Sequence, residues 1–209
     1  MLKGILSVVT ANAGDSGPRD DRDLARDARG GDERAFALLV ERHSGGLHRA
    51  VARILCDESE AWDVVQMAFL KAWQRLDRYD PRWSFATWLY RIGTNVAIDL
   101  IRSRKSRLRA HQAGMEHRLR LVGDHEPTSD RTDQGDVNRV LEKVLPALSP
   151  QQRAAFVLRE IEGLDTNEVA QVLGCTSTTV RNHIFQARKV LRSEIEGQFP
   201  EYLPAVRRN

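Results

Sequence analysis

The chain has 209 residues, of which 41% are hydrophobic and 29% are charged, a composition typical of proteins that fold around an apolar core. These values exclude collagen-like and intrinsically disordered chains. The chain has 32 lysines and arginines against 29 aspartates and glutamates, so its formal net charge is only +3. An average so close to balance can conceal strongly charged patches, and the order of the residues has to show where they lie.

The cysteines and the apolar runs indicate the cellular compartment in which the protein works. Cys56 and Cys175 lie far apart in the sequence, and neither has a second cysteine close enough for a CxxC pair. This spacing argues against a disulfide framework and against a cysteine-based zinc site. The apolar start of the chain is interrupted by Gly4 and Ser7, and no apolar run approaches the roughly 20 residues of a membrane-spanning helix. We expect a cytoplasmic protein without membrane insertion.

The first part of the chain predicts an extension followed by a compact helical domain. Residues 1–23, which end in a stretch rich in Gly, Asp and Arg, are expected to be a disordered N-terminal extension. Asp32 is the predicted N-cap of the first helix. We expect a helical domain over residues 24–106. Its apolar residues recur at helical spacing in three segments, at 36–55, 61–76 and 85–100.

A polar stretch with scattered glycines, residues 107–136, has no sustained apolar periodicity and is expected to be an interdomain linker. Beyond it, Ser149 to Gln152 forms a predicted capping box, and Asp165 to Glu168 repeats the device. We expect a second helical domain at 137–199 and a C-terminal tail at 200–209. Because no strand-like alternation persists, the predicted fold class is all-α, with two small helical domains joined by a flexible linker.

Residues 166–187 predict a short helix, a tight turn and a second helix. Gly174 can adopt the positive φ that the turn demands, and Ala170 is small enough for two helices to cross closely. The buried faces would come from Val169, Leu173, Val180 and Ile184. This spacing indicates a helix-turn-helix, whose second helix enters the major groove of DNA.

The second helix of this unit has the charge that DNA binding requires. From Thr176 to Arg192 the chain has four basic residues and no acidic one, so the helix presents an uncompensated positive face. Arginine, asparagine and glutamine on such a face can read bases. The competing interpretation is an ordinary helical hairpin with solvated basic residues. The predicted DNA-reading residues are Thr178, Thr179, Arg181, Asn182, Phe185, Gln186 and Arg188.

Aromatic residues concentrate in the N-terminal domain, where eight of the thirteen in the chain fall between Trp62 and Tyr90. Tyr79 and Trp83 lie in the predicted loop between the second and third helices, beside two arginines. Bases can stack on aromatic rings while arginine binds phosphate, so such a loop suits single-stranded nucleic acid. The alternative is a loop tryptophan that packs back onto its own domain.

The third predicted helix supports the same interpretation. Its polar face comprises Arg91, Asn95, Asp99 and Arg102. Residues 102–109 then add five basic residues and no acid. Together with Tyr79, this face could hold a displaced strand, although a solvent-facing amide is the alternative for Asn95.

The head of the second predicted helix has the opposite charge. Residues 57–63 contain four acidic residues and no basic one. Acidic residues in a first turn favour the helix dipole, and they also make this helix unattractive to DNA and suited to a protein partner. The net charge of +3 is therefore interpreted as the sum of two basic DNA surfaces, at 102–109 and 176–192, and one acidic surface for a protein.

Two sets of motifs occur in the order found in a known family. The first domain carries RGGDERAF at 29–36, DVVQ at 63–66 and FATWLYRI at 85–92, followed by Asn95 and Asp99. The second carries LSPQQRAAFVLREIEGL at 148–164, EVAQVLG at 168–174 and TVRNHIFQAR at 179–188. Both sets resemble the bacterial extracytoplasmic-function (group 4) sigma factors. The resemblance covers residues 24–105 and 137–197, and two motif sets in order are more specific than either alone.

This resemblance implies a promoter-specificity subunit that binds core RNA polymerase and promoter DNA. Its first domain would recognise and help melt the minus-10 element, and its helix-turn-helix would read the minus-35 element through the residues named above. The core-polymerase-binding residues would be Asp63, Val64, Gln66, Met67 and Phe69. The minus-10 residues would be Tyr79, Trp83, Arg91, Asn95 and Arg102. Of the minus-10 residues, Tyr79 and Asn95 would capture an extruded base.

Two positions depart from the family pattern. Met67 stands where glutamate is usual, which affects one polar contact with the polymerase. Gln186 stands where many members carry arginine, so the minus-35 sequence of another member does not transfer. Members often answer to an anti-sigma factor, so the resemblance implies such a partner, together with a regulon of the stress or envelope type.

The alternative function is a stand-alone helix-turn-helix transcriptional regulator that senses a signal with its N-terminal domain. The aromatic loop and the helix at 63–69 argue against it. An enzyme is less compatible with the sequence, because the six histidines form no metal-ligand spacing and no glycine-rich phosphate loop occurs. We expect no catalysis, no metal, no cofactor and no small-molecule substrate.

Overall fold

The structure, a computed structural model, describes residues 19–114 and 133–202. Every regular element within these ranges is helical, which confirms the predicted all-α fold class. The N-terminal domain consists of α2 (Asp21–Arg29), α3 (Glu33–Leu55), α4 (Glu58–Gln74), the 3-10 helix η1 (Leu76–Arg78) and α5 (Phe85–Gly114). The C-terminal domain consists of α6 (Asp133–Val144), η2 (Leu145–Ala147), α7 (Pro150–Phe156), η3 (Val157–Ile161), α8 (Thr166–Leu173), α9 (Ser177–Gln198) and η4 (Pro200–Tyr202). Residues 1–18 of the predicted extension, 115–132 of the predicted linker and 203–209 of the predicted tail lie outside the described ranges.

Helix α2 begins inside the range that was expected to be a disordered extension, so that expectation is wrong for residues 21–23. The helix buries Leu24 in the core of the N-terminal domain. Its first residue, Asp21, accepts a hydrogen bond from Arg42 Nη1 at 2.9 Å and lies 2.7 Å from His43 Nε2, both on α3. These contacts attach α2 to the domain.

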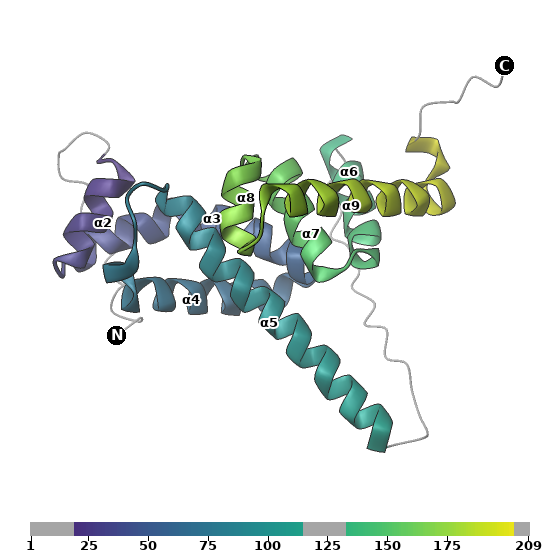
Figure 1. Cartoon of the computed structure of the whole chain (residues 1–209), viewed down its shortest axis with the longest axis horizontal. Coiled ribbons are helices and arrows are strands. Elements are labelled where there is room, and N and C mark those ends of the chain that lie inside the picture. The colour runs from purple at the N-terminus through teal and green to yellow at the C-terminus, as the bar shows by residue number, and fades with distance from the viewer. Residues whose placement is uncertain (1–18, 115–132, 203–209) are drawn as a thin grey trace.

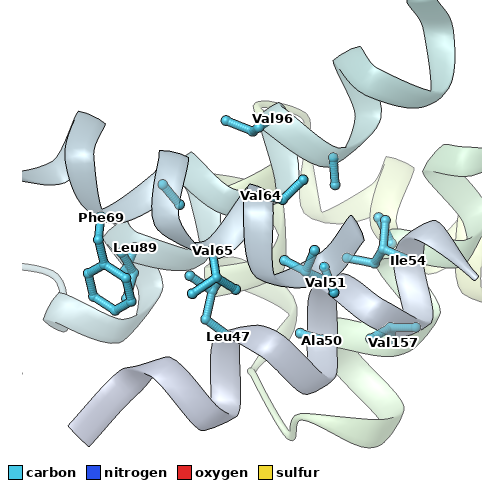
Figure 2. Packing of buried hydrophobic residues seen from close by; sticks show 14 of the residues in the cluster. Leu47, Ala50, Val51, Ile54, Val64, Val65, Phe69, Leu89, Val96 and Val157 are labelled. Carbon is cyan, nitrogen blue, oxygen red and sulfur yellow. The ribbon is translucent and has the colours of Figure 1, made fainter. Parts of the chain in front are cut away.

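Helices α3, α4 and α5 form the core of the N-terminal domain (Figure 2). The predicted N-cap of α3 is confirmed, because the Asp32 carboxylate accepts hydrogen bonds from two backbone N–H groups of the first turn. Helices α3 and α5 approach closely at Gly93, where a Cβ atom would lie 2.7 Å from Leu47 Cδ1. The buried side chains of this core include Leu47, Val51, Ile54, Val65 and Phe69.

Both predicted capping boxes of the C-terminal domain are formed. Ser149 Oγ accepts from the backbone N–H of Gln152 at 3.4 Å, and Gln152 Oε1 accepts from the Ser149 N–H at 3.1 Å. Asp165 and Glu168 make the same reciprocal pair at the start of α8, with both distances 2.9 Å. Between α7 and α8 the chain passes through a π-helical segment, η3, which the sequence did not predict.

The range expected to be a linker, 107–136, is helical at both of its described ends, since α5 continues to Gly114 and α6 begins at Asp133. The C-terminal part of α5 projects from the body of the molecule (Figure 1). Helices α7 and α8 pack against α5, and η3 packs against α3. Val157 of η3 is buried beside Ile54 of α3 (Figure 2). The two domains therefore share an apolar contact.

Candidate nucleic-acid and polymerase interfaces

Helices α8 and α9 form the predicted helix-turn-helix. Gly174 ends α8 with a φ of 63°, the left-handed conformation that glycine adopts without strain. Thr176 caps α9, because its hydroxyl accepts a backbone hydrogen bond from the first turn at 3.1 Å. Ser177 Oγ donates to Asn167 Oδ1 at 2.7 Å, which ties the start of α9 to α8. These bonds fix how α9 is presented.

The side chains predicted to read DNA lie on the face of α9 opposite its buried residues. Val180, Ile184 and Ala187 are buried against the rest of the domain. Phe185 is 65% exposed, so its side chain is accessible on this face. The exposed members are Thr178, Arg181, Asn182, Phe185 and Arg188, whereas Thr179 and Gln186 are half-buried.

One of these residues is already paired with an acidic group. Arg188 Nη2 donates to Glu160 Oε2 of η3 at 2.8 Å. Most of the Arg188 side chain is exposed, so water screens the pair and its contribution to stability is small. The basic segment 176–192 was expected to be uncompensated, and that expectation is wrong at Arg188, because the acid comes from another element.

The ring of Tyr79 is 5% exposed, which contradicts the prediction that it offers a stacking surface for bases. It packs on Phe85 and Trp88, with centroid separations of 5.7 Å and 5.4 Å. Its hydroxyl donates to the Trp83 carbonyl at 2.9 Å, and Arg29 Nη2 donates to the Tyr79 carbonyl at 2.8 Å. Burial raises the pKa of the phenol. Tyr79 therefore holds the loop at 79–84 in place and does not face DNA.

An exposed ion pair stands at the tip of the same loop. Arg82 Nη2 lies 2.6 Å from Asp80 Oδ2, and hydrogen bonds from the Arg82 side chain lower the pKa of the Asp80 carboxyl. Trp83 follows this pair and is half-buried. Of the two loop aromatics predicted to stack on bases, only Trp83 keeps an accessible surface.

The four residues of the predicted polar face of α5 are all exposed. They are Arg91, Asn95, Asp99 and Arg102. Asp99 Oδ1 lies 3.6 Å from Arg102 Nη1 one turn later, so part of the basic charge is balanced within the helix. Arg91 and Trp83 line the same cleft, which makes the loop at 79–84 and this face neighbours.

Arg104 of α5 lies against the acidic head of α4. Arg104 Nη2 is 3.5 Å from Asp57 Oδ2 and also contacts the Glu60 carboxylate. The segment 102–109 has no acid in sequence, but at Arg104 the surface does have acidic neighbours. The two oppositely charged features that the sequence assigned to different surfaces therefore meet in the fold.

Helix α4 divides the residues predicted to bind core polymerase between two faces. Val64 and Phe69 are 2% and 3% exposed and belong to the domain core, so they do not offer the predicted direct contact. Asp63, Gln66 and Met67 are exposed. A motif match alone does not reveal which of its residues point into the core. The helical period of the apolar residues does reveal this.

The exposed side of α4 also contains two residues that the sequence reasoning missed. Trp62 and Leu70 are 49% and 39% exposed, and they flank Gln66 at four-residue spacing on one face of the helix. Trp62 stacks on His48 of α3, with centroids 4.2 Å apart. We call Trp62, Asp63, Gln66, Met67 and Leu70 the α4 face. Exposed apolar side chains at helical spacing are typical of a protein-docking surface.

Metal-ligand clusters and membrane-spanning helices are both absent from the described residues. Among them, no group of three or more His, Cys, Asp or Glu side chains is arranged to hold a metal ion. None of the described helices combines the length and the apolar content that crossing a bilayer requires. Cys56 and Cys175 are free thiols, and burial raises the pKa of each.

Family models match both domains. The family model described as Sigma-70 region 2 matches residues 39–107, and the one described as Sigma-70, region 4 matches residues 138–191. The second match contains the helix-turn-helix. Fold and motifs together define a two-domain transcription initiation factor of the sigma-70 type.

Full-length relatives specify the group within that class. The chain is 32% identical to the RNA polymerase sigma-H factor of Pseudomonas aeruginosa, over 84% of this chain and 94% of the relative. It is 35% identical to the RNA polymerase sigma factor CnrH of Cupriavidus metallidurans, over 86% and 97%. It is 31% identical to the ECF RNA polymerase sigma factor SigW of Bacillus subtilis, over 79% of this chain and 91% of the relative. The chain belongs to the extracytoplasmic-function group of sigma-70 family RNA polymerase sigma factors, as its motifs predicted.

Solved structures agree with this assignment. CnrH in complex with the cytosolic domain of CnrY has a TM-score of 0.63 and 32% identity, and the match covers 85% of this chain and 98% of CnrH. The sigma factor RpoE in complex with the anti-sigma factor NepR, from Bartonella quintana, has a TM-score of 0.62 at 22% identity, covering 78% and 98%. The second likeness supports the fold alone.

Proposed function

We propose that this sigma factor acts in the cytoplasm and uses a separate surface for each partner. Helix α9 reads the minus-35 element, and the polar face of α5 engages the minus-10 element together with Trp83. The α4 face docks on core RNA polymerase. The observation that carries the proposal is the exposed face of α9, which holds Arg181, Asn182 and Phe185 clear of the domain core.

Minus-35 reading follows from the chemistry of that face. A helix-turn-helix places the early residues of its second helix at base edges in the major groove. Arg181 can donate two hydrogen bonds to guanine, and Asn182 can pair with adenine in the same bidentate way. Lys189 and Arg192 lie further along α9 and would meet phosphates, which adds affinity without sequence preference.

Minus-10 engagement uses a different chemistry, because a melted strand offers exposed bases. Trp83 supplies a surface on which a base can stack, and Asn95 supplies an amide that can donate to and accept from a base edge. Arg91 and Arg102 would bind the adjacent phosphates. Tyr79 acts indirectly, because its hydroxyl donates a hydrogen bond to the Trp83 carbonyl at 2.9 Å and holds the loop in place.

Polymerase docking and its control are assigned to the α4 face. Its apolar residues, Trp62, Met67 and Leu70, stand beside Asp63 and a polar amide, a mixture that suits a protein partner. CnrH, a relative of this chain, was solved in complex with the cytosolic domain of another protein. We propose that an anti-sigma partner binds this chain and inhibits it by covering the α4 face.

Arg181→Ala tests the proposal on the α9 face. If Arg181 pairs with a base, the change should weaken binding of the cognate minus-35 duplex by about 1–3 kcal/mol and relax specificity at one position. Arg192→Ala is the matched control, and it should weaken binding to all duplexes equally and reduce the salt slope by about 1. Fluorescence anisotropy across a panel of duplexes measures both effects. A uniform loss for Arg181→Ala would make it a phosphate contact.

Transcription in vitro tests the function as a whole. The purified chain should convert core polymerase from nonspecific to promoter-directed initiation. Absence of both promoter-directed initiation and core binding would contradict the proposal. Strong duplex binding without core binding would instead favour a stand-alone regulator.

A further inference from the structure

Polar contacts join the two domains across their interface. Glu162, just after η3, accepts one hydrogen bond from Arg53 Nη1 of α3 and one from Tyr90 Oη of α5, each at 3.2 Å. The Glu162 side chain is 9% exposed, so these donors compensate its burial. Near α8, Thr87 Oγ1 donates to Glu168 Oε1 at 2.8 Å. We call these three hydrogen bonds the interdomain clasp.

The interface also contains an apolar contact. Val157 of η3 is fully buried beside Ile54 of α3 (Figure 2). Burial and the adjacent Glu162 carboxylate raise the pKa of Tyr90 well above its ordinary value, so its hydroxyl stays a donor into the alkaline range as well. An apolar centre with a satisfied polar rim is the anatomy of a specific interface.

The same packing brings part of the proposed minus-10 surface and the helix-turn-helix around one cleft of about 530 Å³. Trp83 and Arg91 line it from the N-terminal domain, whereas Asn167, Gln171 and Ser177 line it from the helix-turn-helix. The minus-10 and minus-35 positions are about 25 base pairs apart, which is on the order of 80 Å of duplex at about 3.4 Å per base pair. With the helix-turn-helix held this close to Trp83 and Arg91, the two DNA surfaces cannot reach both positions on the same duplex.

We propose that the interdomain clasp holds the free sigma factor in a closed, self-inhibited state that has to open before both promoter elements can be bound. This inference rests on the proposed function for what is inhibited, but the closed state is a property of the free chain. For a polymerase that binds only the open state, the apparent Kd equals the intrinsic Kd divided by the fraction of chains that are open. Loss of the clasp should therefore tighten polymerase binding.

A double variant, Tyr90→Phe with Glu162→Gln, tests the clasp. It removes the hydroxyl and the charge but keeps the size of both side chains, and neither residue belongs to the α4 face or to the proposed DNA surfaces. The open-to-closed ratio should rise about tenfold to a hundredfold, as expected when part-buried, charge-assisted hydrogen bonds are lost. The apparent Kd for core polymerase should fall by the same factor while the closed state still predominates.

Two measurements report on the free and bound chain. Small-angle X-ray scattering compares the radius of gyration of the wild-type chain and the double variant without any partner. A fluorescence titration with core polymerase gives the apparent Kd. Glu41→Gln is the matched control, because it makes the same charge change at an exposed position of α3 and should leave both readings unchanged.

The outcomes separate this inference from the proposed function. A compact wild-type chain, with tighter core binding by the double variant, supports the clasp. An extended wild-type chain, or a double variant with wild-type core affinity, overturns it, and promoter-directed transcription by the wild-type chain would leave the proposed function intact. If no form binds core polymerase, the proposed function fails, and scattering of the free variants decides on the clasp. Tyr90→Phe alone, which keeps the packed ring, replaces the double variant if circular dichroism shows that the latter unfolds.

Discussion

In the helix-turn-helix, the side chains proposed to read DNA stand on an exposed face of α9, and the aromatic ring among them, Phe185, is 65% exposed. In the loop at 79–84, the ring of Tyr79 is 5% exposed and packs on Phe85. Both regions combine an aromatic residue with nearby arginines. The difference shows that this combination produces a DNA-facing ring only where the backbone directs the ring away from the core.

The direction of each ring has a different origin. For Phe185 it is set locally, because Gly174 and the cap at Thr176 fix where α9 starts. For Tyr79 it depends on α2, since Arg29 donates to the carbonyls of both Leu76 and Tyr79 from about 50 positions away in the chain. Long-range contacts of this kind decide burial and leave no short sequence signature.

Tyr79→Ala should have the largest effect of the changes that test this contrast. It removes a buried ring and the hydrogen bond to the Trp83 carbonyl. Deleting a buried aromatic side chain lowers the free energy of unfolding by about 3–5 kcal/mol. Urea denaturation followed by circular dichroism measures the loss.

Two further variants make that test specific. Phe185→Ala truncates an exposed ring and should change the free energy of unfolding by no more than about 0.5 kcal/mol. Tyr79→Phe keeps the packing and should lose only about 1 kcal/mol with the hydroxyl. Similar small losses for both alanine variants would show that the two regions do not differ as described.

Gly174→Ala tests the local origin of the α9 orientation. A Cβ atom at Gly174 would meet nothing within 4 Å, so the effect comes from its φ of 63° alone. Placing an L residue in this conformation costs about 1–2 kcal/mol of unfolding free energy. Gly197→Ala is the matched control, because its Cβ also meets nothing within 4 Å but the residue is helical.

The two glycine variants should have effects of opposite sign. Replacing glycine by alanine inside a helix stabilises by about 0.5–1 kcal/mol. Thermal unfolding under identical conditions compares them directly. A Gly174→Ala variant as stable as Gly197→Ala would mean that the left-handed turn does not determine how α9 is presented.

Features that depend on neighbours in the chain could be predicted from the sequence. The cap at Asp32 and the capping boxes at Ser149 and Asp165 each rest on residues within one helical turn. The face of α9 was likewise predictable, because its buried and exposed residues follow one helical period. The π-helical segment η3 had no such local signal.

Features that depend on distant contacts could not be predicted in the same way. Helix α2 is 9 residues long, and its attachments to α3 and to the loop at 79–84 are all long-range. Val64 and Phe69 were assigned to the polymerase contact as parts of a motif, although the helical period places them inside. The interdomain clasp was out of reach, because its donors and acceptors lie at least 72 positions apart.

Arg104→Gln should have a smaller effect than Tyr79→Ala or Gly174→Ala, and it applies the comparison of buried and exposed side chains to a charged residue. Arg104 contacts the Asp57 and Glu60 carboxylates, but 34% of its side chain is exposed. An ion pair so open to water contributes no more than about 1 kcal/mol, and the contribution should shrink in about 1 M salt. Lys105→Gln, at the exposed position next to it, is the control. A loss above about 2 kcal/mol that salt does not reduce would make Arg104 a structural residue. A small, salt-sensitive loss would leave its guanidinium free to exchange Glu60 for a DNA phosphate.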